Sequence, residues 1–172
     1  MGFLLLVPFF LIRFGLLARL DRNAVARAAH FSPLRGGEVA AYWVYQLSNA
    51  AILLCILFLK IRFAPPALFF TGAGLFLAGT ALLAASVVGF AAPSEDGVNR
   101  GGPYRYSRNP MYAAYFVFFL GCALLLQSRL LLGLVLVFQA AAHWIIRSEE
   151  RWCLERFGES YRRYMREVRR YF

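Results

Sequence analysis

Residues 101–112 read Gly101-Gly102-Pro103-Tyr104-Arg105-Tyr106-Ser107-Arg108-Asn109-Pro110-Met111-Tyr112, a polar turn set between apolar segments. Two glycines and two prolines prevent a long regular helix from running through it. Two arginines and three tyrosines give it charge, hydrogen-bond donors and aromatic faces. Residues 147–151, Arg-Ser-Glu-Glu-Arg, form a charged cluster at the edge of a later apolar run. We predict that the polar turn and the charged cluster fold together into one pocket.

The remainder of the chain is strongly apolar. Hydrophobic residues make up 60% of its 172 residues, against roughly 45–50% in soluble domains, and the mean hydropathy is +0.57. This composition predicts an all-α integral membrane protein forming a single domain, residues 1–172. The net charge of +10 comes from arginines placed at the ends of apolar segments, which is typical of membrane topology and disfavours nucleic-acid binding.

Five apolar runs define the expected transmembrane spans, residues 3–20, 40–59, 67–91, 111–126 and 130–146. A span needs about 20 residues and at least roughly 17, so the last two are expected to form a short, tight hairpin.

Several local features refine this plan. Arg13 interrupts the first span and is expected to face the protein interior or to snorkel. A short interfacial helix is expected around Arg22–Ala29. The tail after residue 147 has aromatic residues at helical spacing with arginines between them, and Gly158 divides it into two helical pieces. This amphipathic tail is expected to cap the pocket.

Small residues recur four apart in the third span. They are Gly74 and Ala78, and then Ala81, Ala85 and Gly89. Such spacing lets a neighbouring helix approach closely. We therefore interpret this stripe as a helix-packing face.

The basic residues predict the orientation. With five spans, fifteen of them lie on one side, in the first connection, the loop Arg100–Arg108 and the tail, and only Lys60, Arg62 and Arg129 lie on the other. The richer side is expected to be cytoplasmic, so the N-terminus lies outside and the pocket inside. Eighteen arginines against one lysine suggest a GC-rich genome and a bacterial inner membrane.

Metal chemistry is not expected. The three cysteines are Cys55, Cys122 and Cys153, two of them within apolar runs, and no pair has metal-ligand spacing. The oligomeric state is left open.

A polar stripe runs along the fifth span, formed by Gln139, His143, Arg147 and Glu150 at helical spacing. Ionisable groups at this depth face a cavity or a partner rather than lipid. For Gln139 the sequence favours a structural hydrogen-bond network. For Arg147 and Glu150 it favours a ligand site, because the polar turn is expected beside them.

The residue types indicate the ligand. Glu149 and Glu150 accept hydrogen bonds from an ammonium group or a ribose. Four tyrosines offer ring faces to a cation or an adenine: Tyr104, Tyr106, Tyr112 and Tyr115. Such a set suits S-adenosylmethionine better than a polyanionic dinucleotide, because carboxylates oppose phosphates. The chain also lacks a glycine-rich phosphate loop.

The run Gly-Pro-Tyr-Arg-Tyr-Ser-Arg-Asn-Pro-Met-Tyr, residues 102–112, resembles the loop of the isoprenylcysteine carboxyl methyltransferase and phospholipid N-methyltransferase superfamily. The second signature of that superfamily also matches, at Glu149-Glu150, Leu154, Phe157-Gly158, Tyr161, Tyr164 and Val168. Together the two signatures cover about residues 101–172, and the first three spans match in hydropathy alone.

The resemblance implies a membrane enzyme that binds S-adenosylmethionine from the cytosol and takes a lipophilic acceptor from the bilayer. That acceptor would be a prenylcysteine-like carboxylate, a phospholipid amine or another small lipophile. The implied cofactor residues are Gly102, Pro103, Tyr104, Arg108, Asn109, Pro110, Tyr112, Glu149 and Glu150. Arg147 and Glu150 would lie nearest the reacting centre, and Gln139, His143 and Tyr115 are the candidates for substrate contact.

Two positions depart from the superfamily pattern. Asn109 stands where histidine is common, and an amide cannot titrate, so acid–base work there is excluded. The ending after Val168 lacks the usual proline. A carboxylate acceptor would need only a cationic guide such as Arg147, whereas an amine would need a base such as Glu150.

Two other functions fit parts of the pattern. An NADPH-dependent membrane reductase of the sterol-reductase type has a similar tail, but the Glu149-Glu150 pair and the Arg-Asn-Pro turn argue against it. A non-catalytic membrane scaffold with the same fold is the other alternative.

Overall fold

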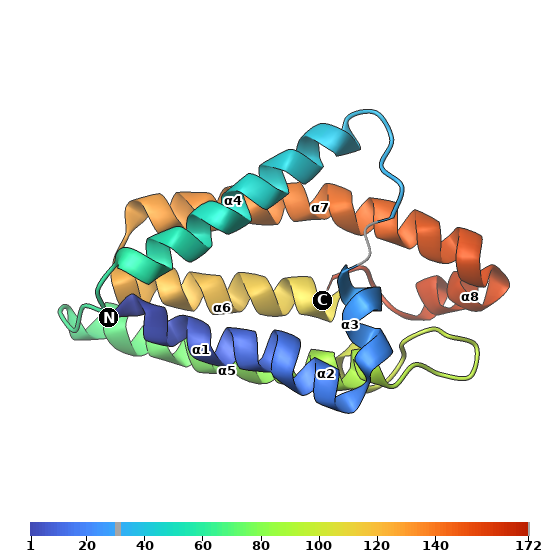
Figure 1. Cartoon of the computed structure of the whole chain (residues 1–172), viewed down its shortest axis with the longest axis horizontal. Coiled ribbons are helices and arrows are strands. Elements are labelled where there is room, and N and C mark those ends of the chain that lie inside the picture. The colour runs from blue at the N-terminus through green and yellow to red at the C-terminus, as the bar shows by residue number, and fades with distance from the viewer. Residues whose placement is uncertain (30–31, 172) are drawn as a thin grey trace.

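The computed structural model describes residues 1–29 and 32–171, and its secondary structure is helical, as expected (Figure 1). The helical segments are η1 (Gly2–Leu5), α1 (Leu6–Phe10), η2 (Leu11–Leu16), α2 (Leu17–Leu20), α3 (Arg22–Ala29), α4 (Glu38–Phe58), α5 (Pro66–Ala91), η3 (Gly102–Arg105), α6 (Pro110–Leu126), α7 (Arg129–Phe157) and α8 (Glu159–Glu167). The short helix expected around Arg22–Ala29 is therefore confirmed as α3.

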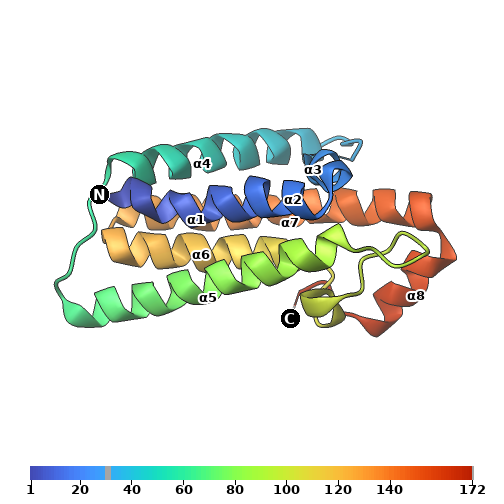
Figure 2. The same cartoon turned by 60° about the horizontal axis from the view of Figure 1, so that its bottom comes forward.

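The long helices lie side by side and alternate in direction, from the rod η1–α2 through α4, α5 and α6 to α7 (Figures 1 and 2). Residues 21–29 and 32–37 of the first connection, the loop 92–109 and α8 gather at one end of the bundle, which we call the polar end. The N-terminus and the connections 59–65 and 127–128 lie at the other, the hairpin end. The polar turn and the tail therefore share one end of the molecule, as the span count predicts.

Within the described part of the chain, four helical segments are long and apolar enough to cross a membrane: Gly2–Leu20, Glu38–Phe58, Pro66–Ala91 and Arg129–Phe157. The remaining apolar helix, Pro110–Leu126, has 17 residues. The prediction of about five apolar spans, with a short fourth one, is confirmed. Gln127 in a left-handed conformation and Ser128 as N-cap make the tight hairpin between α6 and α7.

The fifth apolar run and the first helical piece of the tail form one continuous helix. The apolar run was expected to end at residue 146, and α7 continues beyond it through the charged cluster to Phe157. No proline or glycine interrupts the residues after Ile146, so the helix persists after the apolar run has ended. Gly158, with φ +55°, reverses the chain into α8. The expected division of the tail at this glycine is confirmed.

Helix α5 packs closely on α6, but not through the predicted stripe of small residues. Gly74, Ala78, Ala81 and Ala85 are exposed, and Gly89 lies against the polar turn. A Cβ on Gly79 would collide with the backbone of Phe118, and one on Gly121 with the backbone of Phe76. A Cβ on Gly74 would meet open space, so this member of the predicted stripe lies away from α6. Spacing alone finds a face of small residues but does not reveal which of several faces meets the neighbour.

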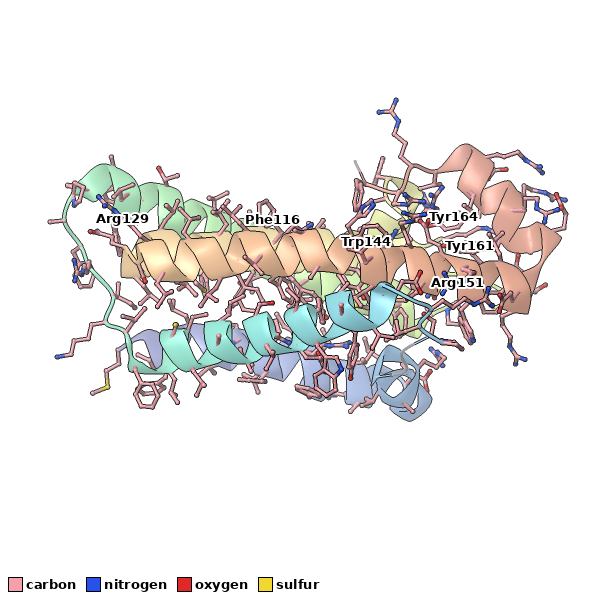
Figure 3. All side chains as sticks on the ribbon, turned by 90° about the horizontal axis from the view of Figure 1, so that it is seen from above. Phe116, Arg129, Trp144, Arg151, Tyr161 and Tyr164 are labelled. Atoms are coloured by element: carbon pink, nitrogen blue, oxygen red, sulfur yellow. The ribbon has the colours of Figure 1, made fainter. Side chains whose placement is uncertain are left out.

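The first connection is fastened to α7. Ser32 Oγ donates a hydrogen bond to Ser148 Oγ over 2.8 Å. Arg151 donates to both carboxylate oxygens of Glu38, each over 2.7 Å. Figure 3 shows Arg151 on the side of α7 that faces the start of α4, while Tyr161 and Tyr164 belong to α8. The two sides of α7 thus serve different neighbours at the polar end.

Candidate functional site

The polar turn rests against the end of α5. Gly102, with φ +56°, opens the short helix η3, and Tyr104 within it is buried. The carbonyl of Tyr104 accepts a hydrogen bond from the Tyr164 hydroxyl of α8 over 2.7 Å. A Cβ on Gly89 would lie 2.8 Å from the carbonyl oxygen of Gly101, so a side chain there would displace the turn.

Glu150 collects the polar side chains of this end of the bundle. Its Oε1 accepts from Arg108 Nε over 2.9 Å and from Asn109 Nδ2 over 3.2 Å. Its Oε2 accepts from Arg170, whose Nε lies at 2.9 Å and whose Nη2 lies at 2.8 Å. Only 4% of the Glu150 side chain is exposed. The predicted meeting of the polar turn with the charged cluster therefore centres on one buried carboxylate.

Residues 168–171 follow α8 and run beside the polar turn, and we call them the C-terminal strap. Arg108 N donates to the carbonyl of Arg169 over 2.9 Å, and Ser107 forms a parallel bridge with the same residue. The carbonyl of Arg170 accepts from Ser107 Oγ and Asn109 Nδ2, each at 3.2 Å. The backbone of the strap is thus bound to the polar turn at several points.

Farther along, the strap reaches His143, a residue of the polar stripe that was predicted to contact the substrate. The hydroxyl of Tyr171 lies 2.7 Å from Nδ1 of His143 on α7. The rings of Tyr171 and His143 are 6.1 Å apart between centroids. The strap therefore covers the face of α7 that carries His143 and Glu150.

Two arginines hold Glu150, and they differ in how they are fixed. Arg108 also donates from Nη1 to the carbonyls of Met165 and Val168, over 3.0 and 2.9 Å. Its side chain is 8% exposed, whereas that of Arg170 is 34% exposed. The hydrogen bonds to Glu150 raise the pKa of Arg170 above its usual range. Glu150 is therefore paired with one buried and one partly exposed arginine.

Glu149 lies on another face of α7 and forms a second polar pair. The Tyr112 hydroxyl donates to its Oε1 over 2.7 Å. Tyr45 of α4 and Tyr115 of α6 lie beside Tyr112, with ring centroids 6.3 and 6.2 Å away. The guanidinium of Arg13 acts electrostatically on Glu149 and on Tyr115. A carboxylate, an arginine and several aromatic rings therefore share the interior next to the polar turn.

The other predicted residues are dispersed. Arg147 is exposed, with its guanidinium over the ring of Trp144 at 5.2 Å from the centroid. Oε1 of Gln139 is buried and has no hydrogen-bond partner among residues 1–29 and 32–171. Pro110 is buried at the first position of α6. The polar stripe predicted along α7 is thus divided: the strap contacts His143 and Glu150, and Arg147 faces outwards.

A cluster of charged and polar groups fixes α8 to the loop before the polar turn. Asp96 accepts a hydrogen bond from Ser160 and pairs with Arg100, whose Nη1 lies 2.7 Å from Oδ2. These contacts hold the pKa of Asp96 below its usual range. Tyr161 and Tyr164 pack with Val98 on the inner side of α8. The helix that carries the strap is therefore fixed at its start and along its inner face.

Sequence reasoning missed Arg170, Ser107 and Tyr45 as parts of this environment. Arg170 is one of eight arginines in the tail, and nothing in its spacing distinguishes it. Its role depends on the reversal at Gly158, which returns the chain to the polar turn. Arg13 was expected either to face the interior or to snorkel, and its action on Glu149 and Tyr115 supports the interior alternative.

The residues present fit a cationic, adenine-bearing cofactor. Two carboxylates, Glu149 and Glu150, lie on adjacent faces of α7, and tyrosine rings line the interior between them and α4. Carboxylates and ring faces both attract cations. Within the described residues, no group of three or more histidine, cysteine or acidic side chains is placed to hold a metal ion.

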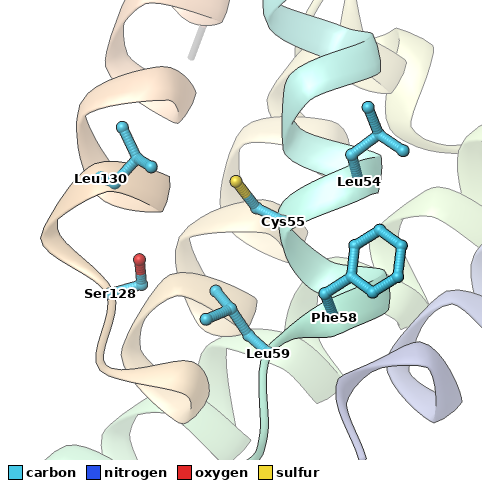
Figure 4. Close-up of a pocket in the computed structure, with 6 residues that line it drawn as sticks. All are labelled: Leu54, Cys55, Phe58, Leu59, Ser128 and Leu130. Atoms are coloured by element: carbon cyan, nitrogen blue, oxygen red, sulfur yellow. The ribbon is translucent and has the colours of Figure 1, made fainter.

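A separate hollow lies at the hairpin end, between the end of α4 and the start of α7 (Figure 4). It measures about 300 Å³ and is lined by Leu54, Cys55, Phe58, Leu59, Ser128 and Leu130. This hollow offers mostly aliphatic and aromatic carbon, and it lies far along the bundle from Glu150. It is not part of the candidate site.

Comparison with known proteins bears on the same part of the chain. A family model described as phospholipid methyltransferase matches residues 69–160. The match takes in most of α5, the polar turn, α6, α7 and the start of α8. No curated protein and no protein of solved structure matches the chain.

Proposed function

The chain belongs to the phospholipid methyltransferase family, and we propose that it transfers a methyl group from S-adenosylmethionine to a lipophilic acceptor. Membership makes it a membrane methyltransferase, because the matched residues cover more than half of the chain. The cofactor, the acceptor and the orientation in the membrane are our proposals. The acceptor is a prenylcysteine-like carboxylate, a phospholipid amine or another small lipophile.

One observation carries the proposal. Arg108 and Asn109, from the first signature, both donate to Glu150, from the second. These hydrogen bonds hold the two signatures together, and they meet at a buried carboxylate beside tyrosine rings. We propose that the cofactor lies here, along residues 102–112 and against Glu149 and Glu150.

When bound, S-adenosylmethionine supplies an electrophilic methyl group on a positively charged sulfur. The protein contributes mainly by holding the reacting groups in line. Tyr112 fixes Glu149 through its hydroxyl, and Arg108 with Asn109 fixes Glu150. Side chains held in this way lose little entropy when a ligand arrives, which favours positioning as the source of the rate enhancement.

Which residues would take part in the reaction depends on whether the acceptor is an amine or a carboxylate. Both oxygens of Glu150 already accept hydrogen bonds from arginine, so we propose a positioning role for it in place of the base suggested by the sequence. Glu149 accepts one hydrogen bond, from Tyr112, and is the better candidate to take a proton from an amine. Arg147, exposed beside Trp144, is our candidate to guide an anionic acceptor.

Two variants separate these acceptor classes. With an amine acceptor, Glu149→Gln should lower kcat by about a hundredfold or more, because general-base catalysis contributes 10²–10⁴-fold. With a carboxylate acceptor the same variant should retain most of its rate, and Arg147→Gln should raise KM instead. Methyl transfer from labelled cofactor into a lipid extract, followed by identification of the product, names the acceptor.

The cofactor is tested by thermal stabilisation of the purified protein. S-adenosylhomocysteine should raise Tm, and NADPH should leave it unchanged, since a ligand stabilises the folded state that binds it. A shift with NADPH alone would favour a reductase of the sterol-reductase type. No shift with either ligand would favour a non-catalytic scaffold.

We propose that the polar end faces the cytoplasm of a bacterial inner membrane. Support comes from the fifteen basic residues on the connections and tail at that end. A cysteine introduced at the exposed Ser94 should react with a membrane-impermeant thiol reagent only in inside-out vesicles. Reaction in right-side-out vesicles would reverse the orientation.

A further inference from the structure

The two cations on Glu150 are not equivalent. Arg108 is almost fully buried and holds Glu150 while also donating to two backbone carbonyls of the tail. Arg170 is about one-third exposed, and every hydrogen bond described from its guanidinium goes to Glu150. Removing Arg108 would unpair several groups at once. Moving Arg170 would release a single carboxylate oxygen.

The strap does not need the Arg170 side chain to stay in place. Its backbone is bound through the carbonyls of Arg169 and Arg170, which accept from the polar turn. Its end is bound separately, through the Tyr171 hydroxyl and His143. The guanidinium can therefore turn towards solvent while the chain on either side remains docked.

We propose that Arg170 competes with an ammonium group of the bound cofactor for Oε2 of Glu150, and so sets the affinity of the site. This inference rests on the proposed function, since it concerns the same pocket. The exchange conserves charge: one cation leaves the carboxylate as another arrives, and Arg108 keeps the other oxygen neutralised. A carboxylate this deeply buried is costly to leave half-paired, which makes exchange preferable to simple opening.

The competition has a chemical signature. A ligand with a primary ammonium group, such as S-adenosylhomocysteine, binds more tightly when Arg170 no longer occupies Glu150. A ligand that has the adenosine part but no amino acid part, such as 5′-methylthioadenosine, has no ammonium group to pair with Glu150, so its affinity does not depend on Arg170. Arg170 therefore acts as an internal selector for ligands that carry an ammonium group.

The test is isothermal titration of the full chain in lipid nanodiscs. Arg170→Gln should bind S-adenosylhomocysteine about five- to tenfold more tightly than the unmodified protein, because a partly exposed ion pair of modest strength no longer competes. Its affinity for 5′-methylthioadenosine should not change. Arg170→Lys keeps a competing cation and should bind like the unmodified protein. Arg169→Gln alters an exposed neighbour on the same strap and is the matched control.

Unchanged or weaker binding of S-adenosylhomocysteine by Arg170→Gln would overturn the proposal and make Arg170 part of the binding surface. Equal tightening for both ligands would also overturn it, because the effect would not depend on the ammonium group. If Arg170→Gln melts early, Arg170→Met serves instead: it keeps a long side chain but no competing cation, and it must change affinity in the same direction. If the unmodified protein and every variant fail to bind S-adenosylhomocysteine, the proposed function falls as well.

Discussion

Arg108 and Glu150 form a buried ion pair across 42 residues of sequence, with 2.9 Å between Nε and Oε1. The pair joins the start of α6 to α7 at the level where both helices leave the apolar part of the bundle. It is therefore at once a structural contact of the fold and the centre of the candidate site. Substitutions here will affect stability and function together, so tests of function need controls for folding.

Arg108→Ala should lower the free energy of unfolding by about 3 kcal/mol or more, because removing one partner leaves a buried charge only partly compensated. Arg162→Ala is the control, since its ion pair with Glu159 has side chains 65% and 58% exposed and should cost less than about 1 kcal/mol. Chemical unfolding in one detergent measures both. Equal small losses would mean that the Arg108 pair contributes no more than a surface contact.

Tyr112→Phe removes the hydroxyl that donates to Glu149 and should cost about 1–3 kcal/mol, since hydrogen bonds to charged groups are the stronger ones. Affinity for S-adenosylhomocysteine should fall about tenfold if that carboxylate borders the cofactor. Tyr115→Phe is the control, because its hydroxyl makes a long 3.9 Å contact with Met111 Sδ. Indistinguishable titrations of the two variants would exclude Glu149 from the pocket.

Gly79→Ala should destabilise the protein by about 1–3 kcal/mol, because the new methyl group meets the backbone of Phe118 and forces α5 away from α6. Gly74→Ala lies on the same helix in open space. It should be neutral or up to about 1 kcal/mol stabilising through helix propensity. Thermal melts of the two variants give the comparison, and a reversed order would mean that α5 packs through its other face.

The lowered pKa of Asp96 predicts that the stability of the fold at the start of α8 depends on pH. The pKa of Asp96 is lowered in the folded protein, first by the hydrogen bond from Ser160 and also by Arg100. It therefore stabilises the fold above the unfolded pKa of about 3.9, and this contribution is lost as pH falls through the lower folded pKa. Asp96→Asn should melt below the unmodified protein at pH 6, with the difference closing below about pH 4. Glu95→Gln, at the exposed neighbour, should melt like the unmodified protein throughout.

The apolar runs made most of the fold predictable, because runs of nearly 20 apolar residues admit few structures other than spanning helices. Local turn chemistry was as informative: Gly158 ends α7 where the tail was expected to divide, and α6 starts at Pro110, one residue before the expected span. The polar turn and the charged cluster were expected to meet, and Arg108, Asn109 and Glu150 do so.

The rest depended on geometry that the sequence does not encode locally. Arg170 reaches Glu150 only because α8 folds back and the strap pairs with Ser107. Arg147 has the right spacing to accompany Glu150 but turns outwards over Trp144. Helical periodicity places residues on a face to within a fraction of a turn. At a helix with neighbours on several sides, that fraction decides which neighbour a side chain meets.

The modest length of α6 has a consequence for access. Its 17 residues rise about 26 Å, whereas the 29 residues of α7 rise about 44 Å. Both helices begin or end together at the hairpin end, where Gln127 and Ser128 join them. In a bilayer with a hydrocarbon core of roughly 30 Å, we therefore expect the start of α6 to lie just below the level of the lipid headgroups. A lipid acceptor of the proposed reaction would then reach the candidate site while its acyl chains stay in the bilayer.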